Sequence, residues 1–339
     1  MSWAKPMPAN PVVAVAGATG AVGREMLLVL EQRDFPAANV RALASARSAG
    51  STVPFRGGEL TVEEMTPDSF AGVDIALFAA GGSVSEQLRP AVVAAGAVMI
   101  DNSSAFRMEE GVPLVVPEVN PQAAAEHSGV IANPNCSTIQ MVVTLSPLHK
   151  LAPIKRVVVS TYQAASGAGA QGMSELYDQS REFLDGKPLT VKKFAHQIAF
   201  NCIPHIDVFL DDGTTKEEWK MVVETHKILD PSIEVCANCV RVPVLRCHAE
   251  MVNVEFTAAV SVEKAREAFA AAPGVIVQDD PATSTYPMPG LLAGTNATYV
   301  GRLRKDPSVE NGLNFWCVAD QLRKGAALNA VQIAELLLP

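Results

Sequence analysis

The chain has 339 residues, 48 % of them hydrophobic, and a chain of this length is expected to form two domains with a core each. Its formal net charge of −9, from 27 basic and 36 acidic residues, is repelled by nucleic acid phosphates and by anionic lipid, which argues against both as partners. Apolar runs stay short of the ~20 residues that span a bilayer. Residues 1–11 resemble neither a signal peptide nor a transit peptide, so we expect a cytoplasmic protein.

The first part of the chain alternates short apolar runs with helical patterns. Val12–Ala16 has the pattern of a buried strand ended by Gly17, and Ala21–Glu31 has that of the helix that follows. Further expected elements are strands at Asn39–Ala46, Asp74–Ala80, Ala97–Asp101 and Leu114–Val116 and a helix at Ser85–Ala95. This alternation predicts an α/β domain with a doubly wound parallel sheet, covered by helices on both faces.

After about Leu151 the pattern changes to longer and more alternating strands. The expected strands are Arg156–Gln163, Cys236–Val244 and Glu250–Val260, and the expected helices are Met173–Phe183, Thr215–Leu229 and Val262–Ala271. They predict a second, α+β domain with a mixed, mostly antiparallel sheet that has one exposed face. The helical tail Lys324–Leu338 is expected to pack back on the first domain, which gives predicted boundaries of 1–135 plus 321–339 for the first domain and 136–320 for the second.

A glycine-rich segment joins the first strand to the first helix. It reads Gly17-Ala18-Thr19-Gly20-Ala21-Val22-Gly23, which is the spacing G-x-x-G-x-x-G. A helix N-terminus offers unpaired backbone N–H groups and a partial positive charge to a phosphate, and glycines let the backbone approach it. At a strand-to-helix junction the motif predicts a dinucleotide site, and the alternative is a tight turn needed only for packing.

The end of the second strand indicates which dinucleotide binds. NAD sites usually place Asp or Glu there to hold the ribose 2′-hydroxyl. This chain has no acid at that point and reads Ala44-Ser45-Ala46-Arg47-Ser48. An arginine flanked by serines is suited to a 2′-phosphate, so Ser45, Arg47 and Ser48 predict NADP, unless Arg47 is an ordinary exposed loop residue.

A single cysteine stands at the start of a predicted helix. The segment Asn133-Pro134-Asn135-Cys136-Ser137-Thr138 follows a short apolar run and precedes an apolar helical pattern. Asn135 is suited to an N-cap, which would place Cys136 in the first turn, where the helix dipole favours a thiolate. The residues alone leave two interpretations of Cys136 open, a nucleophile and a small buried apolar side chain.

Other cysteines and a histidine raise the question of a metal site. Cys236 and Cys239 form a C-x-x-C pair, followed by Cys247 and His248. Structural zinc needs four converging ligands, whereas this pair lies in a strand-like run and the two adjacent residues would face opposite sides. The six cysteines are scattered, so we expect no metal, no redox pair and no disulfide framework. Arg241 and His248, near opposite ends of one strand-like segment, are instead suited to flank a small anionic substrate.

Jointly these motifs resemble the aspartate-β-semialdehyde dehydrogenase family over nearly the whole chain. Further matching segments are Phe78–Ser85, Asp101–Arg107, Tyr162–Gly167 and Arg241–Val244 with His248. The resemblance implies a Rossmann-type NADP-binding domain at 1–135 plus 321–339 and a catalytic and dimerisation domain at 136–320. It also implies a homodimer or tetramer that reduces β-aspartyl phosphate to aspartate semialdehyde with NADPH, at the entry to lysine, methionine, threonine and diaminopimelate synthesis.

The same resemblance implies the roles of individual residues. Cys136 matches the thioester nucleophile, Gln163 a substrate-orienting residue, and His248 the acid/base, which we expect to take the thiol proton with an ordinary imidazole pKa. Implied substrate contacts are Asn135 beside the nucleophile, Arg241 for the α-carboxylate, Glu217 for the amine, and Arg107 and Lys220 for the phosphate. Implied further cofactor contacts are Ser166, Gly167 and Gln321.

Some positions leave room for other interpretations. Cys247-His248-Ala249 departs from the more usual Gly-His-Ser of the family. From the residues alone, Glu217 is equally suited to a capping box, either Thr214 with Glu217 or Thr215 with Glu218, and Lys220 to a solvated helix face.

Two other functions compete with the one that the family resemblance implies. N-acetyl-γ-glutamyl-phosphate reductase usually has Gly before its cysteine and Tyr after it, so Asn135 and Ser137 favour the aspartyl enzyme. The other is a non-catalytic NADP-binding regulatory protein. The presence of Cys136, Gln163, Arg241 and His248 argues against it.

Overall fold

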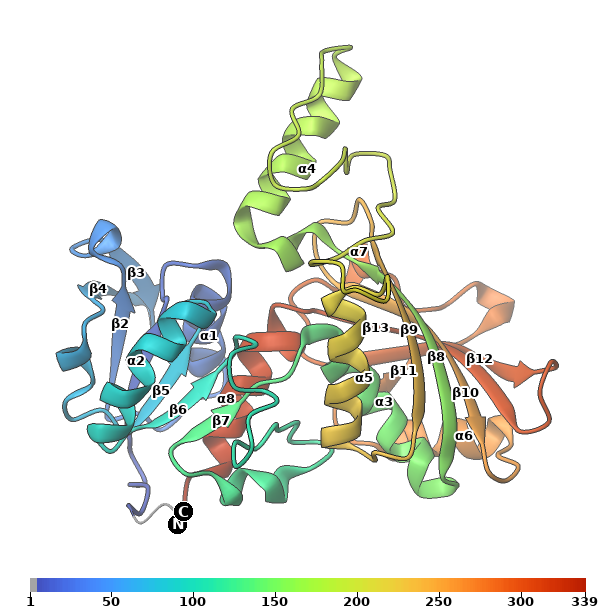
Figure 1. The fold of residues 1–339 in the computed structure, drawn as a ribbon, viewed down its shortest axis with the longest axis horizontal. Coiled ribbons are helices and arrows are strands. Elements are labelled where there is room, and N and C mark those ends of the chain that lie inside the picture. Colours follow the sequence, from blue (N-terminus) through green and yellow to red (C-terminus); the bar gives the residue numbers. More distant parts are fainter. Residues whose placement is uncertain (1–4) are drawn as a thin grey trace. The chain divides into compact units, whose positions relative to one another are not determined.

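The computed structural model describes residues 5–339, which form two compact units. Unit 1 runs to Asn135 and is completed by Ala326–Pro339, and unit 2 is Cys136–Gly325 (Figure 1). The second stretch of unit 1 begins later than Gln321, where the sequence pattern placed it. Gln321 lies in unit 2, where its side chain hydrogen bonds to the backbone of Cys247.

Unit 1 is built on a seven-stranded sheet in the order β3-β4-β2-β1-β5-β6-β7. The strands are β1 (Val12–Ala16), β2 (Asn39–Ala44), β3 (Thr52–Phe55), β4 (Gly58–Glu64), β5 (Ile75–Phe78), β6 (Val98–Asp101) and β7 (Val130–Ala132). Neighbouring strands are parallel except in the β3–β4 hairpin. Apart from β3, this is the Rossmann strand order, in which ligands bind where the order reverses, here between β1 and β5.

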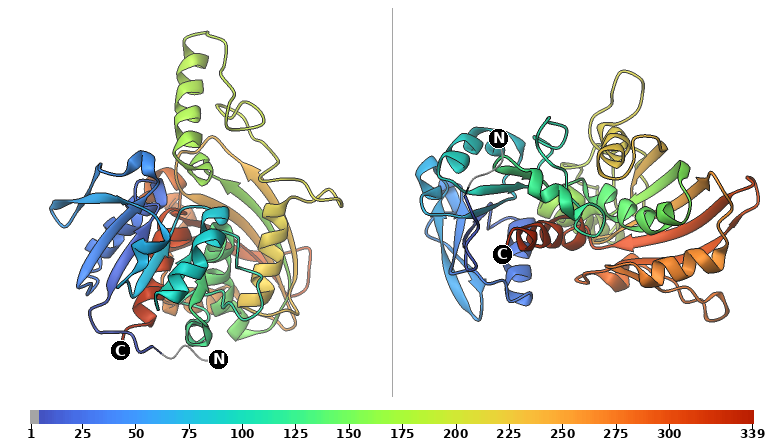
Figure 2. Two further views of the ribbon diagram at one scale, coloured as in Figure 1. Left: turned by 60° about the vertical axis from the view of Figure 1, so that its left-hand side comes forward. Right: turned by 90° about the horizontal axis from the view of Figure 1, so that it is seen from below.

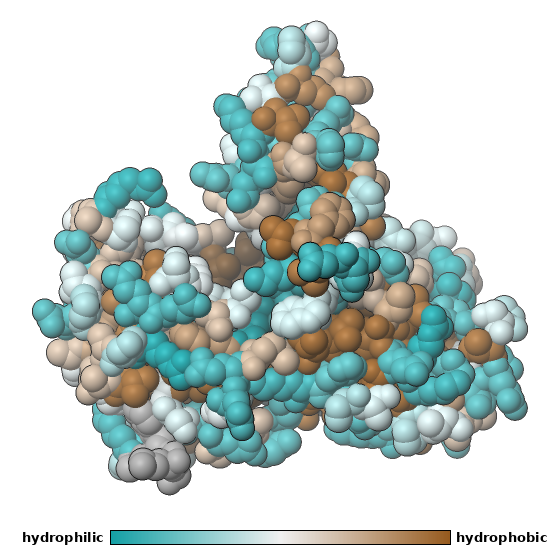
Figure 3. Space-filling view, viewed as in Figure 1, coloured by the Kyte–Doolittle hydropathy of each residue, from teal (hydrophilic) through white to brown (hydrophobic). Residues whose placement is uncertain are grey.

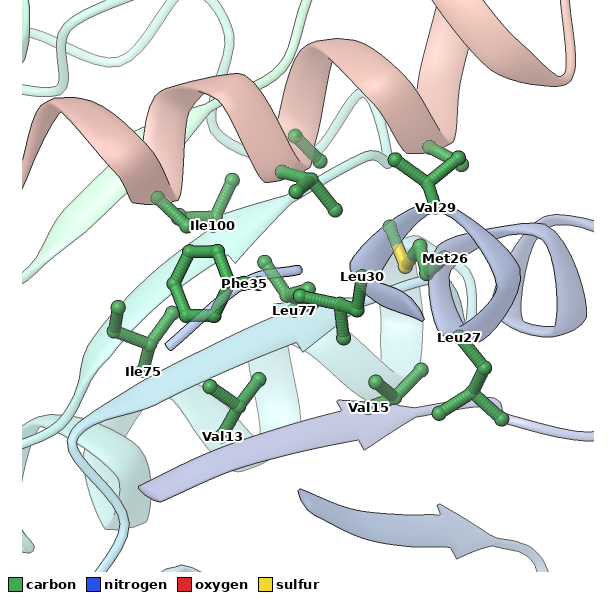
Figure 4. Close-up of a cluster of buried hydrophobic side chains, with 14 of the residues drawn as sticks. Val13, Val15, Met26, Leu27, Val29, Leu30, Phe35, Ile75, Leu77 and Ile100 are labelled. Carbon is green, nitrogen blue, oxygen red and sulfur yellow. The ribbon is translucent and has the colours of Figure 1, made fainter. Parts of the chain in front are cut away.

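Helices cover both faces of this sheet. On one face lie α1 (Ala21–Gln32) and α8 (Leu328–Leu336), and Figure 4 shows Met26 and Leu30 of α1 directed at the strand residues. The other face carries Phe78, which stacks on Phe70 with ring centroids 5.6 Å apart beside α2 (Gly82–Ala94). The doubly wound parallel sheet expected from the alternating pattern is confirmed.

One predicted strand of unit 1 is wrong. Leu114–Val116 is not a strand: Leu114 makes a single bridge to Ala132, and Val130–Ala132 forms the last strand of the sheet. Both three-residue segments are buried and apolar, so composition could not decide which of them forms the backbone hydrogen bonds of the edge strand. The β3–β4 hairpin, which lies at the outer edge and is mostly polar, was not predicted at all.

Unit 2 is built on a six-stranded sheet in the order β11-β12-β13-β10-β8-β9. The strands are β8 (Ile154–Gln163), β9 (Glu234–Arg241), β10 (His248–Phe256), β11 (Val275–Val277), β12 (Thr298–Asp306) and β13 (Gly312–Ala319). The β10–β8, β10–β13 and β12–β13 pairs are antiparallel, and the β8–β9 and β11–β12 pairs are parallel. This is the mixed, mostly antiparallel sheet that the sequence predicted, with β11, β12 and β13 as strands it did not.

One face of this sheet is covered by three helices, α3 (Cys136–Leu151), α5 (Lys216–Ile228) and α6 (Val262–Ala271). Eleven of the sixteen residues of α3 are buried, on all sides of the helix, as expected for a central helix. A fourth helix, α4 (Gly169–Leu184), rises from the end of the sheet with the loop after it as an arm (Figures 1 and 2), and a short helix, α7 (Pro289–Leu292), packs on β13. Apolar residues are visible at the surface of the arm (Figure 3). In the described part of the chain, every helix is too short or too polar to cross a membrane.

Candidate active site

The loop between β1 and α1 is so tight that two of its positions accept only glycine. Gly17 has a φ of +86°, and a Cβ on it would lie 2.7 Å from the carbonyl oxygen of Ala79. A Cβ on Gly23 would lie 2.1 Å from the carbonyl oxygen of Gly17. Gly20 is the N-cap of α1 and has no side chain to cap it. The N-terminus of α1, with Thr19 before it and Val22 in its first turn, therefore presents backbone N–H groups to an anion.

The end of β2 lies beside this loop. The N–H groups of Gly17 and Ala18 donate to the carbonyl oxygen of Leu43 at 2.8 and 3.0 Å. Ser45 then begins a short 3₁₀ turn, Ala46–Ser48, on which the Arg47 side chain is exposed and makes no hydrogen bond to any described residue. The glycine loop and Arg47 thus stand at the carboxyl ends of neighbouring parallel strands, as a dinucleotide and its 2′-phosphate require.

Three predicted site residues lie in one row across neighbouring strands of unit 2. Arg241 ends β9, Gln163 ends β8 and His248 begins β10. Gln163 is the register partner of Arg241, and the pairing of Tyr162 with Ala249 places Gln163 opposite His248. Partners across a sheet share a face, so register brings together residues that are far apart in sequence. We call Arg241, Gln163 and His248 the site row.

The backbone fixes the orientation and the tautomer of His248. The imidazole is fully buried, and its Nδ1 accepts the N–H of Ala164 at 3.0 Å. Nδ1 therefore carries no proton, and the neutral ring carries its hydrogen on Nε2. Nε2 has no hydrogen-bond partner among the residues that the structure describes, so this hydrogen is available to a ligand.

The expected ordinary pKa of His248 is wrong. Burial first, and then repulsion from the Arg241 guanidinium, hold the pKa of His248 well below its usual range. At neutral pH the imidazole is uncharged and acts as a hydrogen-bond donor through Nε2. The resting ring is therefore not the base that takes the thiol proton.

Arg241 links the site row to the cysteine. Its Nη1 donates to the carbonyl oxygen of Ala164 at 2.7 Å, so the backbone of one residue, Ala164, orients both Arg241 and His248. Burial lowers the pKa of Arg241, while attraction to Glu217 and to Cys136 opposes that shift. The guanidinium is thus close enough to Cys136 to attract a thiolate there. Cys136 is half-buried and is the first residue of α3, so the helix dipole acts in the same direction.

Two glycines allow the backbone to approach these side chains closely. A Cβ on Gly167 would lie 2.8 Å from Nη1 of Arg241 and 3.2 Å from Nε2 of His248. A Cβ on Gly325 would lie 2.8 Å from the Cβ of Cys136. Gly325 was not singled out from the sequence, because a lone glycine in a helical pattern carries no sign of what it packs against.

We expect Gly167→Ala to lower kcat by about 10- to 100-fold in a folded protein, because the added methyl group overlaps Arg241 and crowds the available nitrogen of His248. Steady-state kinetics and circular dichroism measure the two effects. Gly290→Ala is the matched control, since a Cβ there meets nothing within 4 Å. Wild-type turnover in both variants would show that the substrate does not occupy the space over the site row.

A chain of polar contacts leads from the site row to α5. Nε2 of Gln163 donates to Oε1 of Glu217 at 3.2 Å, and Nζ of Lys220 lies 3.1 Å from Oε2 of Glu217. Asp207 also binds Lys220, at 2.6 Å. Burial alone lowers the pKa of Lys220, but attraction to Glu217 and Asp207 outweighs it and the pKa is raised. Lys220 is therefore a partly buried, charged amine and not part of a solvated helix face.

The capping box at the start of α5 is formed by Thr215 and Glu218, and both reciprocal hydrogen bonds are present. Thr214 instead binds Asp212, so Glu217 is not the capping residue.

Arg107 and Asn135 belong to unit 1. Arg107 is buried, and its Nε and Nη2 donate to the carbonyl oxygens of Asn133 and Asn102, each at 2.9 Å. These two carbonyls follow β7 and β6, so the guanidinium is held at the carboxyl ends of two parallel strands. Asn135 is also buried, directly before Cys136.

Comparisons with known proteins agree over the full chain. Models of the semialdehyde dehydrogenase NAD binding domain and of the semialdehyde dehydrogenase dimerisation domain match residues 12–127 and 145–324. The aspartate-semialdehyde dehydrogenases of Aquifex aeolicus and Bacillus subtilis are 54 % and 52 % identical to it, over 96 % of this chain and over 97 % and 96 % of their own. The chain belongs to the aspartate-semialdehyde dehydrogenase family. A crystal structure of aspartate semialdehyde dehydrogenase II from Vibrio cholerae matches with a TM-score of 0.94 at 49 % identity, covering 97 % of this chain and 98 % of that one.

The departure from the usual family sequence beside His248 has a backbone consequence. Cys247 has a φ of +75°, in the left-handed region that favours glycine. Its N–H donates to Oε1 of Gln321 at 2.8 Å, and the Gln321 amide in turn donates to the Ser166 hydroxyl. Gln321 and Ser166 thus hold the strained residue next to His248.

The cysteine pair of β9 does not converge. Cys236 is exposed and Cys239 is buried, and three residues of strand place them on opposite faces. Within the described residues, no group of three or more His, Cys, Asp or Glu is arranged to hold a metal.

Proposed function

We propose that this chain is an NADPH-dependent aspartate-semialdehyde dehydrogenase, which converts β-aspartyl phosphate to aspartate semialdehyde and phosphate through a thioester on Cys136. The observation that carries the proposal is the placement of Cys136 at the start of α3, within the field of the Arg241 charge, in the unit that also holds His248 with an available Nε2. A Vibrio cholerae relative with 48 % identity and a TM-score of 0.95 is described as complexed with ASA.

The residues of unit 1 fit NADP. The glycine loop offers N–H groups for the pyrophosphate, and Ser45, Arg47 and Ser48 stand at the end of β2 where the 2′-phosphate is bound. Ser166, Gly167 and Gln321 are proposed as further cofactor contacts. A Candida albicans family member is described as solved with NADP. When bound, NADPH supplies the hydride.

The proposed reaction begins at the sulfur. The Cys136 thiolate attacks the acyl carbon, a C–S bond forms, and the C–O bond to phosphate breaks with its electron pair leaving on the phosphate. Arg107 and Lys220 are the cations proposed to balance the charge of that leaving group. Reduction of the thioester then gives the aldehyde and returns Cys136 as a thiolate.

The remaining site residues orient the substrate and stabilise charge. His248 donates from Nε2 to the carbonyl oxygen as that oxygen becomes negative in each tetrahedral adduct, a role that the neutral ring can fill without first gaining a proton. Arg241 is proposed to bind the α-carboxylate, Glu217 the amine, and Gln163 to orient the substrate through its bond to Glu217. Asn135 is proposed as a substrate contact beside the nucleophile.

We infer that the protein is a homodimer formed by unit 2. The match to a dimerisation domain over residues 145–324 supports this, and so do large apolar side chains that are exposed in unit 2, among them Tyr162, Phe183 and Phe200. A second copy of the chain is the partner that would cover them. A tetramer is the alternative, and sedimentation distinguishes it from a dimer.

The net charge of −9 argues against nucleic acid and anionic membrane partners, and a cytoplasmic location fits the biosynthetic role.

The experiment for the proposed function measures NADPH formation from aspartate semialdehyde and NADP, with and without phosphate. We expect turnover that depends on phosphate, and none with N-acetylglutamate semialdehyde. The reverse preference would make the chain an N-acetyl-γ-glutamyl-phosphate reductase. NADP binding with no turnover of either aldehyde would favour the regulatory interpretation.

We expect Arg47→Ala to raise the KM for NADP by about 10- to 100-fold and to leave the KM for NAD nearly unchanged, because only NADP carries the phosphate that a charge-assisted hydrogen bond recognises. Parallel titrations of the two cofactors provide the measurement. Arg304→Ala removes another exposed arginine, on β12, and should change neither value. Equal weakening of both cofactors by Arg47→Ala would refute its role in selecting NADP.

A further inference from the structure

A second polar row lies next to the site row on the same face of the six-stranded sheet. It crosses four strands, and its members are Cys239 on β9, Thr161 on β8, Glu250 on β10 and Cys317 on β13. All four are buried, and each of the first three lies two residues from the member of the site row on its own strand. The next row, with Val159, Val252 and Phe315, is apolar. Polar groups this deep in a core need a reason.

Glu250 is the member of this row that the proposed reaction does not explain. Its carboxyl is fully buried, Oε2 accepts from Sγ of Cys317 at 3.5 Å, and the Gln140 amide is close enough to act on the pKa of the carboxyl. Oε1 of Glu250 and Oε1 of Gln140 both lack a hydrogen-bond partner within the described part of the protein. One hydrogen resolves this: a protonated carboxyl can donate to the amide oxygen. Burial raises the pKa of Glu250 to about 8, so the neutral acid is the form present at neutral pH.

Gln140 connects this carboxyl to the cysteine. It lies four residues after Cys136 on α3, on the same face and one turn further along. Its Nε2 also contacts Sγ of Cys317 at 3.8 Å, so the amide ties the beginning of α3 to two strands. Glu250 itself lies two residues after His248 on β10, on the same face. The Glu250 carboxyl thus lies between Gln140, on the helix that begins with Cys136, and β10, the strand that begins with His248.

We propose that Glu250 is a positioning residue: through Gln140 it fixes the first turn of α3, and with it Cys136, against the strand that carries His248. This inference rests on the proposed function of Cys136 and His248. A fully paired buried network holds its members in one arrangement, and a displacement of about 1 Å at a reacting atom costs roughly 100-fold in rate.

The same geometry gives a pH dependence. The pKa of Glu250 lies above its ordinary value, so the O–H that Gln140 needs is present below about pH 8 and is lost as pH rises through about 8. The groups that face Glu250 are His248 on its own strand, Cys317 on β13, Cys239 on β9 and Glu217 on α5, and none of them is a cation at that pH. An ionised Glu250 would therefore have no cation beside it, and its charge would oppose a thiolate at Cys136.

The test compares kcat against pH for the wild type, Glu250→Gln and Glu250→Leu in the phosphate-dependent assay. Glutamine keeps an N–H donor and cannot ionise, so Glu250→Gln should stay within about threefold of the wild type at pH 7 and lose the decline above about pH 8. Leucine keeps the volume and removes the contact, so Glu250→Leu should lose at least about tenfold in kcat with little change in KM. Cys239→Ala, in the same buried row, is the control and should keep wild-type kcat.

Each outcome decides something. A wild-type enzyme without phosphate-dependent turnover would contradict the proposed function and not the geometry around Glu250. An active wild type with wild-type kcat in Glu250→Leu would overturn the positioning role alone. Should the leucine variant fail to fold, the glutamine variant decides: an unchanged alkaline decline would overturn the proposal, and its disappearance would support it.

Discussion

Replacing Cys136 with serine should lower kcat by at least about 1,000-fold, because a hydroxyl in the same place is far harder to ionise than a thiol. The Arg241 charge and the N-terminus of α3 assist a thiolate but do not make an alkoxide accessible. The two side chains are nearly equal in size, so folding and NADP affinity should be unchanged. The phosphate-dependent assay measures the first effect and NADP titration the second.

Cys202→Ser is the matched control, because Cys202 is also a free cysteine but is exposed and does not begin a helix. It should have wild-type turnover. If Cys136→Ser retained more than about a tenth of the wild-type kcat, catalysis through a thioester at that position would be refuted.

The second large effect is expected at His248. His248→Ala should lower kcat by about 100- to 1,000-fold, because it removes the donor proposed for the developing oxyanion. The sign of the pH effect follows from the lowered pKa: the ring stays neutral as pH falls through 6.5, and its protonation begins only well below that value. The wild-type profile should therefore show no loss of kcat near pH 6.5 that belongs to this residue.

His196→Ala, at an exposed position, is the control and should leave kcat and its pH profile unchanged. A wild-type decline centred near pH 6.5 that disappears in His248→Ala would mean that the imidazole titrates normally. That result would contradict the burial and the charge that the structure places around it.

The parts of the fold that sequence predicted are those that depend on local pattern. The β1–α1 junction and the start of α3 at Cys136 follow from motifs a few residues long, and both are where they were expected. The helical tail was recognised from its periodicity, whereas the point at which it rejoins unit 1 depends on tertiary contacts, such as that of Gln321 with Cys247 in unit 2, which no pattern reveals.

The parts of the site that sequence missed depend on register and burial. Nothing in the chain order says that Gln163 will stand between Arg241 and His248, since this follows from how three strands pair. The state of His248 was mispredicted because its pKa is set by the packing around it and by Arg241, not by its neighbours in sequence. Glu250 shows the same limit. In the sequence it is an ordinary acidic residue, whereas in the fold it is buried and its raised pKa keeps it uncharged at neutral pH.

The most direct test of a thioester on Cys136 is an assay without phosphate. With aspartate semialdehyde, NADP and excess substrate, the thioester forms but has no phosphate to release it. We expect a rapid burst of NADPH equal to the concentration of chains, followed by near arrest, and an aspartyl group bound to the peptide that contains Cys136. No burst, or an adduct on a different residue, would contradict it.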